Sequence, residues 1–376
     1  MTTVDPRDLV VFGEDWGRHP SSTQHLVKRL AGTRRVVWVN SIGLRRPRAN
    51  LGDLGRVVDK LARRRRAEAP AAARPASLSI VPPLAVSWPG SSLAAWTNRR
   101  VLGWQVRRAL ERRDIRRPIL WTSLPTAAPL VGALDERAVV YYCGDDFSAL
   151  AGVDHAPVAA LEERLVDRAD LIVAASPELA ARFPSSRTLL LPHGADIAHF
   201  GAPTTVADDL RRDRPVAGFY GSISEWFDVA LLADVARLMP DWDFVLVGEV
   251  RCDVAPLRAL SNVRLLGPRD HADLPRYVQH WQASLLPFRD TPQIRACNPL
   301  KLREYLAAGT PIVSTPFPAL RPYLGLVEVA PSAGAYAAAI RNAAVDTRRN
   351  VYRRSAVRSE SWEQRAAELD HALRSL

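Results

Sequence analysis

Hydrophobic and polar positions alternate along the chain in two repeating forms. Short runs rich in Val, Ile, Leu and aromatic residues are followed by longer stretches in which apolar residues recur at helical spacing. This alternation is typical of βαβ units with buried parallel sheets. In the first half the pattern predicts strands at residues 9–12, 36–39, 78–81, 119–122, 139–142, 171–174 and 188–191. Helices are predicted at residues 24–31, 93–112, 157–168 and 177–183.

The same alternation starts again after residues 202–215, which hold prolines, threonines and charges without periodicity, as a linker does. Strands are expected at residues 216–220, 243–247, 263–265, 283–286 and 311–314, and helices at 229–239, 274–281, 301–308 and 333–345. The predicted domains are 1–203 and 216–350, joined by a linker at 204–215, and 351–376 is expected to be a helical segment packed on the body. The predicted fold class is therefore α/β, with two doubly wound, Rossmann-like domains and a ligand cleft at the carboxyl ends of their strands.

Composition narrows the class of protein. The 376 residues carry a formal charge of +11, which implies an anionic partner such as nucleic acid, a phospholipid surface or a phosphorylated substrate. The three cysteines form no CxxC pair and lie near no histidine cluster, so neither a disulfide framework nor a metal site is expected. The early charges are in the wrong order for a secretory signal, and no apolar run is long enough to span a bilayer. These features predict a cytoplasmic protein.

The most informative stretch is the segment 298–314, NPLKLREYLAAGTPIVS. Asn298 followed by Pro299 predicts a helix start, with Asn298 capping free amide groups and Pro299 at the first helical position. The free amides there, including that of Leu300, and the helix dipole form a site for a phosphate. Lys301 in the first turn is disfavoured by the dipole unless an anion is present. Glu304, one turn later on the same side, could accept hydrogen bonds from ribose hydroxyls.

This segment resembles the retaining, group-one glycosyltransferases of the GT-B class (family 4-like), whose second domain carries the phrase EYLAAG-P-V-V-S after a helix that opens beside the donor diphosphate. The resemblance implies two domains facing each other across a cleft and a nucleotide-sugar donor held by the second domain. Many members have a Glu eight positions before the one that Glu304 matches, and it contacts the sugar. Ala296 stands there in this chain, so Asn298 or Arg295 would have to take over that contact, and Asn298 is a candidate catalytic residue.

A second motif follows the first predicted strand of the second domain, GFYGSISEWFD at 218–228. Gly221 at the end of that strand permits close approach of a ligand to the backbone, and Ser222 and Glu225 follow it. Gly248, after the next strand, is included in the same donor site. Related enzymes often carry basic residues after the first glycine, whereas this chain has Glu225, so Lys301 or arginines such as Arg295 are expected to meet the phosphate charge. The alternative is a tight turn with packed aromatic residues.

In the first domain, the turn PHGAD at 192–196 resembles the P-N-G-x-D turn that precedes the family's linker. His193 replaces the commoner Asn and is a candidate catalytic group beside the donor, or a solvated loop histidine. Two more loops follow predicted strands. One carries Trp16, Gly17 and Arg18, which are candidates for the acceptor side.

The other loop carries Asp145 and Asp146, which are candidates for binding acceptor hydroxyls or, in an inverting enzyme, for general-base catalysis. Turn formation ahead of a helix is the competing explanation for both carboxylates. The resemblance favours retention instead, in which the leaving diphosphate assists the acceptor hydroxyl.

The segment 44–66 is basic and includes four consecutive arginines at 63–66. Its apolar residues fall on one helical face, as in helices that lie on an anionic leaflet, although a solvated helix edge would look the same. Nucleic acid is a less suitable partner because no known binding motif accompanies the charge.

The sequence thus predicts a glycosyltransferase that moves a sugar from a nucleotide diphosphate to a lipid-linked or polysaccharide acceptor in cell-envelope glycan synthesis. We expect no cofactor or metal, and a peripheral position at the inner face of the membrane through 44–66. Two alternatives remain open: a nucleotide-sugar epimerase of the same fold, and a non-catalytic binding or scaffold protein.

Overall fold

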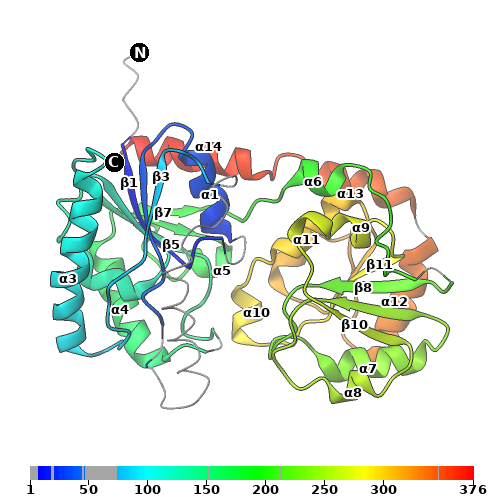
Figure 1. Cartoon of the computed structure of the whole chain (residues 1–376). Helices are drawn as coiled ribbons and strands as arrows, with labels where there is room; N and C mark the ends of the chain where they lie inside the picture. The colour runs from blue at the N-terminus through cyan, green and yellow to red at the C-terminus, as the bar shows by residue number, and fades with distance from the viewer. Residues whose placement is uncertain are drawn as a thin grey trace. The chain divides into compact units, whose positions relative to one another are not determined.

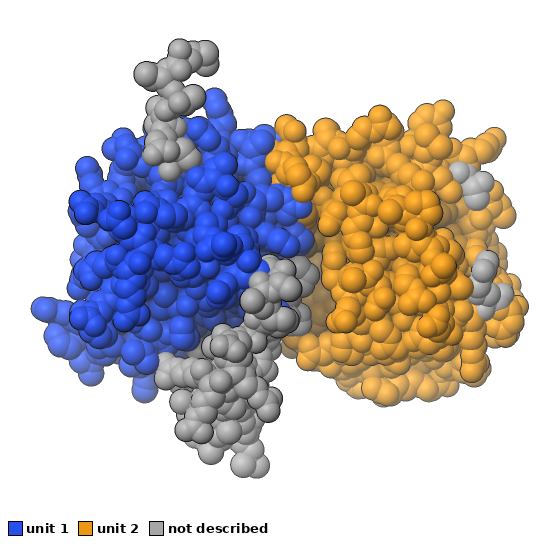
Figure 2. All heavy atoms as spheres, turned by 45° about the horizontal axis from the view of Figure 1, so that its top comes forward, with its two compact units in different colours: residues 1–192, 365–376 blue, residues 193–364 orange. Residues whose placement is uncertain are grey.

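The computed structural model describes residues 7–17, 21–44, 46, 74–150, 152–211, 213–345 and 347–376. The chain divides into two compact units, which Figure 2 distinguishes by colour. Unit 1 contains residues 1–192 and 365–376, and unit 2 contains residues 193–364.

Unit 1 is built on a seven-stranded parallel sheet in the order β3-β2-β1-β4-β5-β6-β7. The strands are β1 (Leu9–Phe12), β2 (Val36–Val39), β3 (Leu78–Val81), β4 (Ile119–Thr122), β5 (Ala138–Cys143), β6 (Leu171–Ala174) and β7 (Thr188–Leu190). The central strands are buried along their whole length, as continuous apolar runs in parallel sheets are. All seven strands predicted for this half are confirmed to within one residue.

The helices of unit 1 cover both faces of this sheet. They are α1 (Ser22–Leu30), α3 (Ser92–Glu111), α4 (His155–Arg168) and α5 (Pro177–Ala180), with 3-10 turns η2 (Pro125–Leu130) and η3 (Ser185–Arg187). Figure 1 shows α3 and α4 on the side of the sheet opposite α1. Right-handed crossovers require this arrangement, because the strand order reverses direction between β3 and β4.

Unit 2 is built on a six-stranded parallel sheet in the order β10-β9-β8-β11-β12-β13. The strands are β8 (Val216–Tyr220), β9 (Asp243–Val247), β10 (Val263–Gly267), β11 (Ala283–Leu286), β12 (Ile312–Ser314) and β13 (Glu328–Val329). The longer helices are α7 (Val229–Leu238), α11 (Leu300–Ala308), α12 (Ala333–Val345) and α13 (Asn350–Ala356), and α14 (Trp362–Arg374) begins in unit 2 and ends in unit 1. The short ones are α6 (Ile197–Gly201), α8 (Ala255–Arg258), α9 (Pro275–Val278), α10 (Pro292–Ala296), η4 (His271–Asp273), η5 (Pro318–Tyr323) and η6 (Thr347–Arg349).

The segment predicted as a linker packs onto unit 2. Ala207 and Leu210 are buried in the core of that unit, and the amide and hydroxyl of Thr204 both donate to the side chain of Gln279 at 3.1 Å. The division between the units therefore falls at Pro192, ahead of the predicted linker at 204–215. Periodicity did not indicate this packing because the segment is held by single apolar side chains and hydrogen bonds.

Helix α14 belongs to both units. It begins in unit 2, where Trp362 is buried, and its last residues belong to unit 1, where Leu369 and Leu373 are buried. In unit 1, the Arg34 guanidinium lies 2.6 Å from the Asp370 carboxylate, and the Arg34 side chain is fully buried. The predicted terminal helix is therefore present, and it completes the first unit.

Candidate functional site

Two glycine turns meet at the carboxyl edge of the sheet in unit 2. Gly221 follows β8 with φ +127°, and Gly248 follows β9 with φ +151°, so both adopt backbone conformations that side chains disfavour. A Cβ atom on Gly248 would lie 2.0 Å from the carbonyl oxygen of Gly221. The two turns therefore lie in direct contact, and the carboxyl edge of a doubly wound sheet is where such folds bind ligands.

Lys301 lies directly over the first of these turns. A Cβ atom on Gly221 would be 2.3 Å from Cε of Lys301, so only glycine leaves room for this side chain. Its Nζ lies 5.5 Å from the ring centroid of Phe219 and 5.2 Å from that of Trp226. Burial lowers the pKa of Lys301, and the nearby Glu304 acts in the opposite direction. Among the residues described, no carboxylate oxygen lies within 4.0 Å of this ammonium group.

The start of α11 differs from the prediction. The helix begins at Leu300, Pro299 occupies the N-cap, and no side chain makes a capping hydrogen bond. Asn298 was predicted to be the cap, but its side-chain oxygen accepts a hydrogen bond from Nη1 of Arg303. That prediction was wrong because a buried guanidinium needs acceptors and a charge-assisted hydrogen bond is stronger than a cap.

The amide groups of the first turn of α11 are consequently left available. Within the described part of the chain, no acceptor is present for the backbone N–H groups of Leu300 and Lys301. In the neighbouring turn, the hydroxyl oxygen of Ser222 is buried and has no hydrogen-bond partner among the described residues. Buried polar groups in proteins normally have partners, so these donors indicate a place for a ligand with anionic or polar oxygens.

Glu304 is buried and already holds two partners. The Tyr220 hydroxyl donates to its Oε2, and Nε2 of His271 lies 3.3 Å from its Oε1. Burial, with the Glu304 charge beside it, raises the pKa of Tyr220, so this hydroxyl stays protonated and remains a donor. The hydrogen bond with Glu304 likewise raises the pKa of His271, although burial opposes that shift. The carboxylate is thus fixed in one orientation at the end of β8.

His271 is one of the residues that the sequence analysis missed. It lies in η4, just after β10, and its ring stacks on His199 of α6 with centroids 5.3 Å apart. The available signal was its position in a polar loop at the carboxyl end of a strand, the same argument that selected Gly221 and Gly248. It was overlooked because a lone loop histidine carries no spacing pattern.

Asn298 and His193 hold the loop before α11 in place. Nδ1 of His193 lies 2.7 Å from the main-chain carbonyl of Asn298, and because a carbonyl can only accept, Nδ1 carries the proton. Arg303, which bonds Asn298, forms a buried ion pair with Glu360 at 2.6 Å. These contacts indicate that His193 and Asn298 position the start of α11, and no distance in the structure tests their predicted catalytic roles.

Two further predicted donor residues, Glu225 and Arg295, are exposed. Glu225 is exposed, and its carbonyl oxygen accepts a hydrogen bond from Arg289. Arg295, on α10, is exposed and forms a two-bond ion pair with Asp290. That pairing engages the Arg295 guanidinium, whereas Lys301 lies directly against the Gly221 turn.

In unit 1, the predicted acceptor-side residues have structural partners. The amide of Trp16 donates to Asn40, and that of Gly17 donates to Gln24 at 3.0 Å. Asp146 accepts hydrogen bonds from Ser148 and forms an ion pair with Arg182 at 2.6 Å, whereas Asp145 is exposed. Turn formation and ion pairing therefore account for Asp146, and the acceptor role of Asp145 stays a prediction.

Two predictions lie outside the described residues. Arg18 is one of them, and the basic segment 44–66 is the other, apart from Leu44 and Arg46. None of the described helices combines the length and the apolar character needed to span a bilayer.

Comparison with known families finds a match within unit 2. The profile of the family "Glycosyl transferases group 1" matches residues 214–346, which include both glycine turns and α11. Residues 214–346 are similar to the group 1 glycosyltransferase domain. The matched range includes Gly221, Gly248, Lys301 and Glu304, whose donor-binding roles stay predictions.

A curated relative supports the same assignment over a larger part of the chain. TuaH of Bacillus subtilis (strain 168), which is named as a teichuronic acid biosynthesis glycosyltransferase, is 29% identical over 220 residues. The match covers 53% of this chain and 55% of TuaH, so the chain spans about half the length of that relative.

Solved structures show the fold of the whole chain. Sucrose-phosphate synthase from Thermosynechococcus elongatus superposes with a TM-score of 0.70 at 16% identity, covering 98% of each chain. Anabaena HepE, solved in complex with UDP-glucose, superposes with a TM-score of 0.68 at 14% identity, covering 98% of this chain and all of HepE. The predicted GT-B fold class is confirmed, and at these identities the likeness concerns the fold alone.

Proposed function

We propose that this chain is a glycosyltransferase whose group 1 domain binds a nucleotide diphosphate sugar at the Gly221 and Gly248 turns. One observation carries the proposal: the Lys301 ammonium lies over Gly221 with no carboxylate partner among the described residues, next to uncapped amide groups of α11. A diphosphate would supply the missing negative charge to both. The UDP-glucose complex of HepE shows that a protein of this fold accommodates such a donor.

Each part of the donor has a suitable partner in this arrangement. The diphosphate would lie against Lys301 and the amides of Leu300 and Lys301, with the Ser222 hydroxyl as a further donor. The ribose hydroxyls would donate to Glu304, whose carboxylate is already oriented by Tyr220 and His271. A carboxylate offers about four lone-pair sites, so these two partners leave acceptor capacity.

The same groups favour departure of the nucleotide. Negative charge develops on the leaving diphosphate as the bond to the sugar breaks, and a fixed cation with aligned amides stabilises that charge. We propose that the reaction retains configuration and needs no metal ion, as the family resemblance of segment 298–314 implies. Transfer that continues at full rate in excess EDTA would support the second statement, and an NMR assignment of the product anomer would test the first.

The acceptor is proposed from the relative. Because TuaH is named for teichuronic acid biosynthesis, we infer a glycan or lipid-linked acceptor in cell-envelope polysaccharide synthesis, with the chain at the inner face of the membrane. The exposed Asp145 is a candidate for contact with acceptor hydroxyls.

Calorimetric titration with UDP-, GDP- and dTDP-sugars tests the donor site. Lys301→Met keeps the length of the side chain and removes its charge, so the affinity for the bound donor should fall about tenfold or more, as for a lost hydrogen bond to a charged group. Lys28→Met is the matched control, because Lys28 is an exposed lysine on α1 of unit 1. Equal donor affinity in both variants would refute the site, and donor turnover without a glycosylated product would favour the epimerase alternative.

A further inference from the structure

Exposed apolar side chains gather on one part of unit 1. Fourteen large hydrophobic residues are exposed in the described part of the chain, and seven of them fall between residues 84 and 104. All three exposed tryptophans are among them: Trp88, Trp96 and Trp104 are 52%, 59% and 52% exposed. Single exposed apolar residues are normal on a protein surface, but a cluster of this kind indicates an interaction site.

Three residues of this cluster lie on one face of α3, together with two arginines. At 100° per residue, the following residues fall within an arc of about 120°: Leu93, Trp96, Arg100, Trp104 and Arg108. The opposite side of the helix packs on the body of unit 1 through Ala94, Asn98, Leu102, Val106 and Leu110. We call the first set, together with Trp88, the tryptophan face. Figure 1 shows α3 as a long helix at the edge of unit 1.

Arginines lie over the tryptophans of this face. The guanidinium of Arg100 lies 5.6 Å from the ring centroid of Trp96, that of Arg108 lies 5.2 Å from Trp104, and that of Arg46 lies 5.8 Å from Trp88. Among the described residues, no carboxylate lies within 4.0 Å of Arg100 or Arg108. The tryptophan face thus combines aromatic rings with arginines that no described carboxylate pairs.

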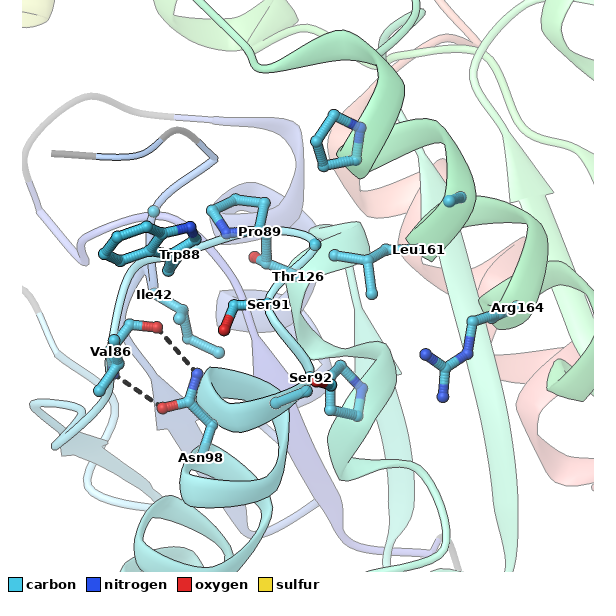
Figure 3. A pocket seen from close by; sticks show the side chains of 16 residues that line it. Ile42, Val86, Trp88, Pro89, Ser91, Ser92, Asn98, Thr126, Leu161 and Arg164 are labelled. Atoms are coloured by element: carbon cyan, nitrogen blue, oxygen red, sulfur yellow. Dashed lines mark hydrogen bonds between the residues drawn. The ribbon is translucent and has the colours of Figure 1, made fainter. Parts of the chain in front are cut away.

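The loop that carries Trp88 is fixed to α3. The side chain of Asn98 exchanges two hydrogen bonds with the backbone of Val86, at 2.7 and 2.9 Å, as Figure 3 shows. Gln105 bonds the same loop through the amide of Leu84 and the carbonyl of Pro82. Trp88 and the helix therefore present one pre-organised surface.

A pocket of about 240 Å³ adjoins this loop and the beginning of α3 (Figure 3). Ile42, Pro89 and Leu161 contribute to its mainly apolar lining. The hydroxyl of Thr126, also in the lining, is buried and has no partner in the described part of the structure. An apolar recess beside the exposed rings favours a partner with apolar chains.

We propose that the tryptophan face docks unit 1 onto the surface of an anionic phospholipid bilayer. Tryptophan is enriched at membrane interfaces because its ring is apolar and its N–H is polar, and arginines on the same surface attract anionic headgroups. A second copy of the chain is a poorer partner, since it would bring an identical arginine-bearing face and the chain carries a net charge of +11. The proposal does not depend on sugar transfer or on the segment 44–66.

Cosedimentation of the full chain with vesicles tests the proposal. We expect binding to vesicles of equal parts phosphatidylglycerol and phosphatidylcholine, little binding to phosphatidylcholine alone, and weakening with salt. Trp96→Ala/Trp104→Ala should lower the partition coefficient about tenfold or more. Arg100→Gln/Arg108→Gln should lower it about fivefold for each arginine.

The matched control is Val351→Ala/Tyr352→Ala, which removes two apolar side chains on α13 that are 74% and 66% exposed. Its partition coefficient should equal that of the wild type. If the alanine variant of α3 fails to fold, Trp96→Phe/Trp104→Phe should still reduce quenching of the tryptophan emission by brominated lipids. Unchanged binding of the folded tryptophan variants, no binding of the wild type, or a wild-type dimer that these variants dissociate would each overturn the proposal.

Discussion

Lys301 occupies a position that is unfavourable for a cation in the absence of a ligand. It lies in the first turn of α11, where the helix dipole presents partial positive charge, and apolar burial lowers its pKa. The rings of Phe219 and Trp226 offset part of this cost by cation–π attraction. An arriving diphosphate would remove the rest, because it interacts with the ammonium and the amides together.

The contact between His271 and Glu304 predicts a pH-dependent stability. The folded pKa of His271 is raised by its hydrogen bond with Glu304, so the charged form stabilises the folded state. That contribution is fully present below the unfolded value of about 6.5 and is lost as the pH rises through the folded pKa. His271→Asn should therefore lower the urea midpoint more at pH 5.5 than at pH 8.5. An equal loss at both pH values would show that the imidazolium contributes nothing.

The ion pair between Arg303 and Glu360 predicts a large loss of stability when the Glu360 side chain is truncated. The Arg303 side chain is buried, so Glu360→Ala leaves a guanidinium without its carboxylate and should lower the free energy of unfolding by about 3 kcal/mol. Asp290→Ala breaks the exposed pair with Arg295 and should have no measurable effect. Denaturant unfolding of the two variants makes the comparison. Similar losses in both would contradict the distinction between a buried and an exposed pair.

At the scale of elements, the same substitution, glycine to alanine, should have different effects at Gly248 and at Gly267. Gly248 and Gly267 both have positive φ, but a Cβ on Gly248 meets the Gly221 carbonyl at 2.0 Å, whereas one on Gly267 meets nothing within 4 Å. Gly267→Ala should cost only the backbone strain, about 1 kcal/mol. Gly248→Ala must also displace the Gly221 turn, so it should lower both stability and donor affinity. Thermal unfolding and donor titration measure the two effects, and equal donor affinity in the two variants would argue against ligand binding at the turns.

The sequence predicted the strands and the longer helices well, because apolar residues recur at one spacing in helices and form short continuous runs in buried strands. It missed β13, which has two residues, and α8 and α10, which have four and five. Such short elements contain less than two turns or one full alternation, so tertiary contacts alone define them. The predicted helix at 274–281 is also shorter in the structure, where α9 ends at Val278.

The candidate site was predictable only in part. Gly221, Gly248, Lys301 and Glu304 follow from their places at strand ends and in the segment 298–314, and the structure brings them together in unit 2. The partners of Glu304 were not predictable, because Tyr220 and His271 come from distant segments. The predicted catalytic and donor-binding roles stay predictions until a donor complex or kinetics of the variants are measured.

At the scale of the molecule, the ion pair between Asp370 in α14 and Arg34 predicts that α14 stabilises the part of unit 1 that contains β1 and β2. Burial tends to raise the pKa of Asp370, but hydrogen bonds from Arg34 and Arg374 lower it. This pair therefore stabilises unit 1 above the unfolded carboxyl pKa, and the contribution is lost as the pH falls through the folded pKa. Asp370→Ala leaves the fully buried Arg34 unpaired, so it should destabilise unit 1 by about 3 kcal/mol.

Hydrogen exchange by mass spectrometry locates that effect. Peptides from β1 and β2 should exchange faster in Asp370→Ala, while peptides from β8 and β9 should keep their protection. Arg374→Ala is the matched control, because it breaks the partly exposed pair with Asp370 on the same helix and leaves the pair between Arg34 and Asp370 in place. Faster exchange confined to unit 2 would contradict the assignment of these residues to unit 1.

The discontinuity of unit 1 has a consequence for biosynthesis. Its sheet is translated before unit 2, yet residues 365–376, which bury Leu369 and Leu373 in it, are translated after unit 2. Nascent unit 1 therefore exposes part of its apolar surface until all of unit 2 has been translated and has begun to fold. During that interval unit 1 is a target for chaperones, and a chain truncated after residue 364 would join a folded unit 2 to an incomplete unit 1.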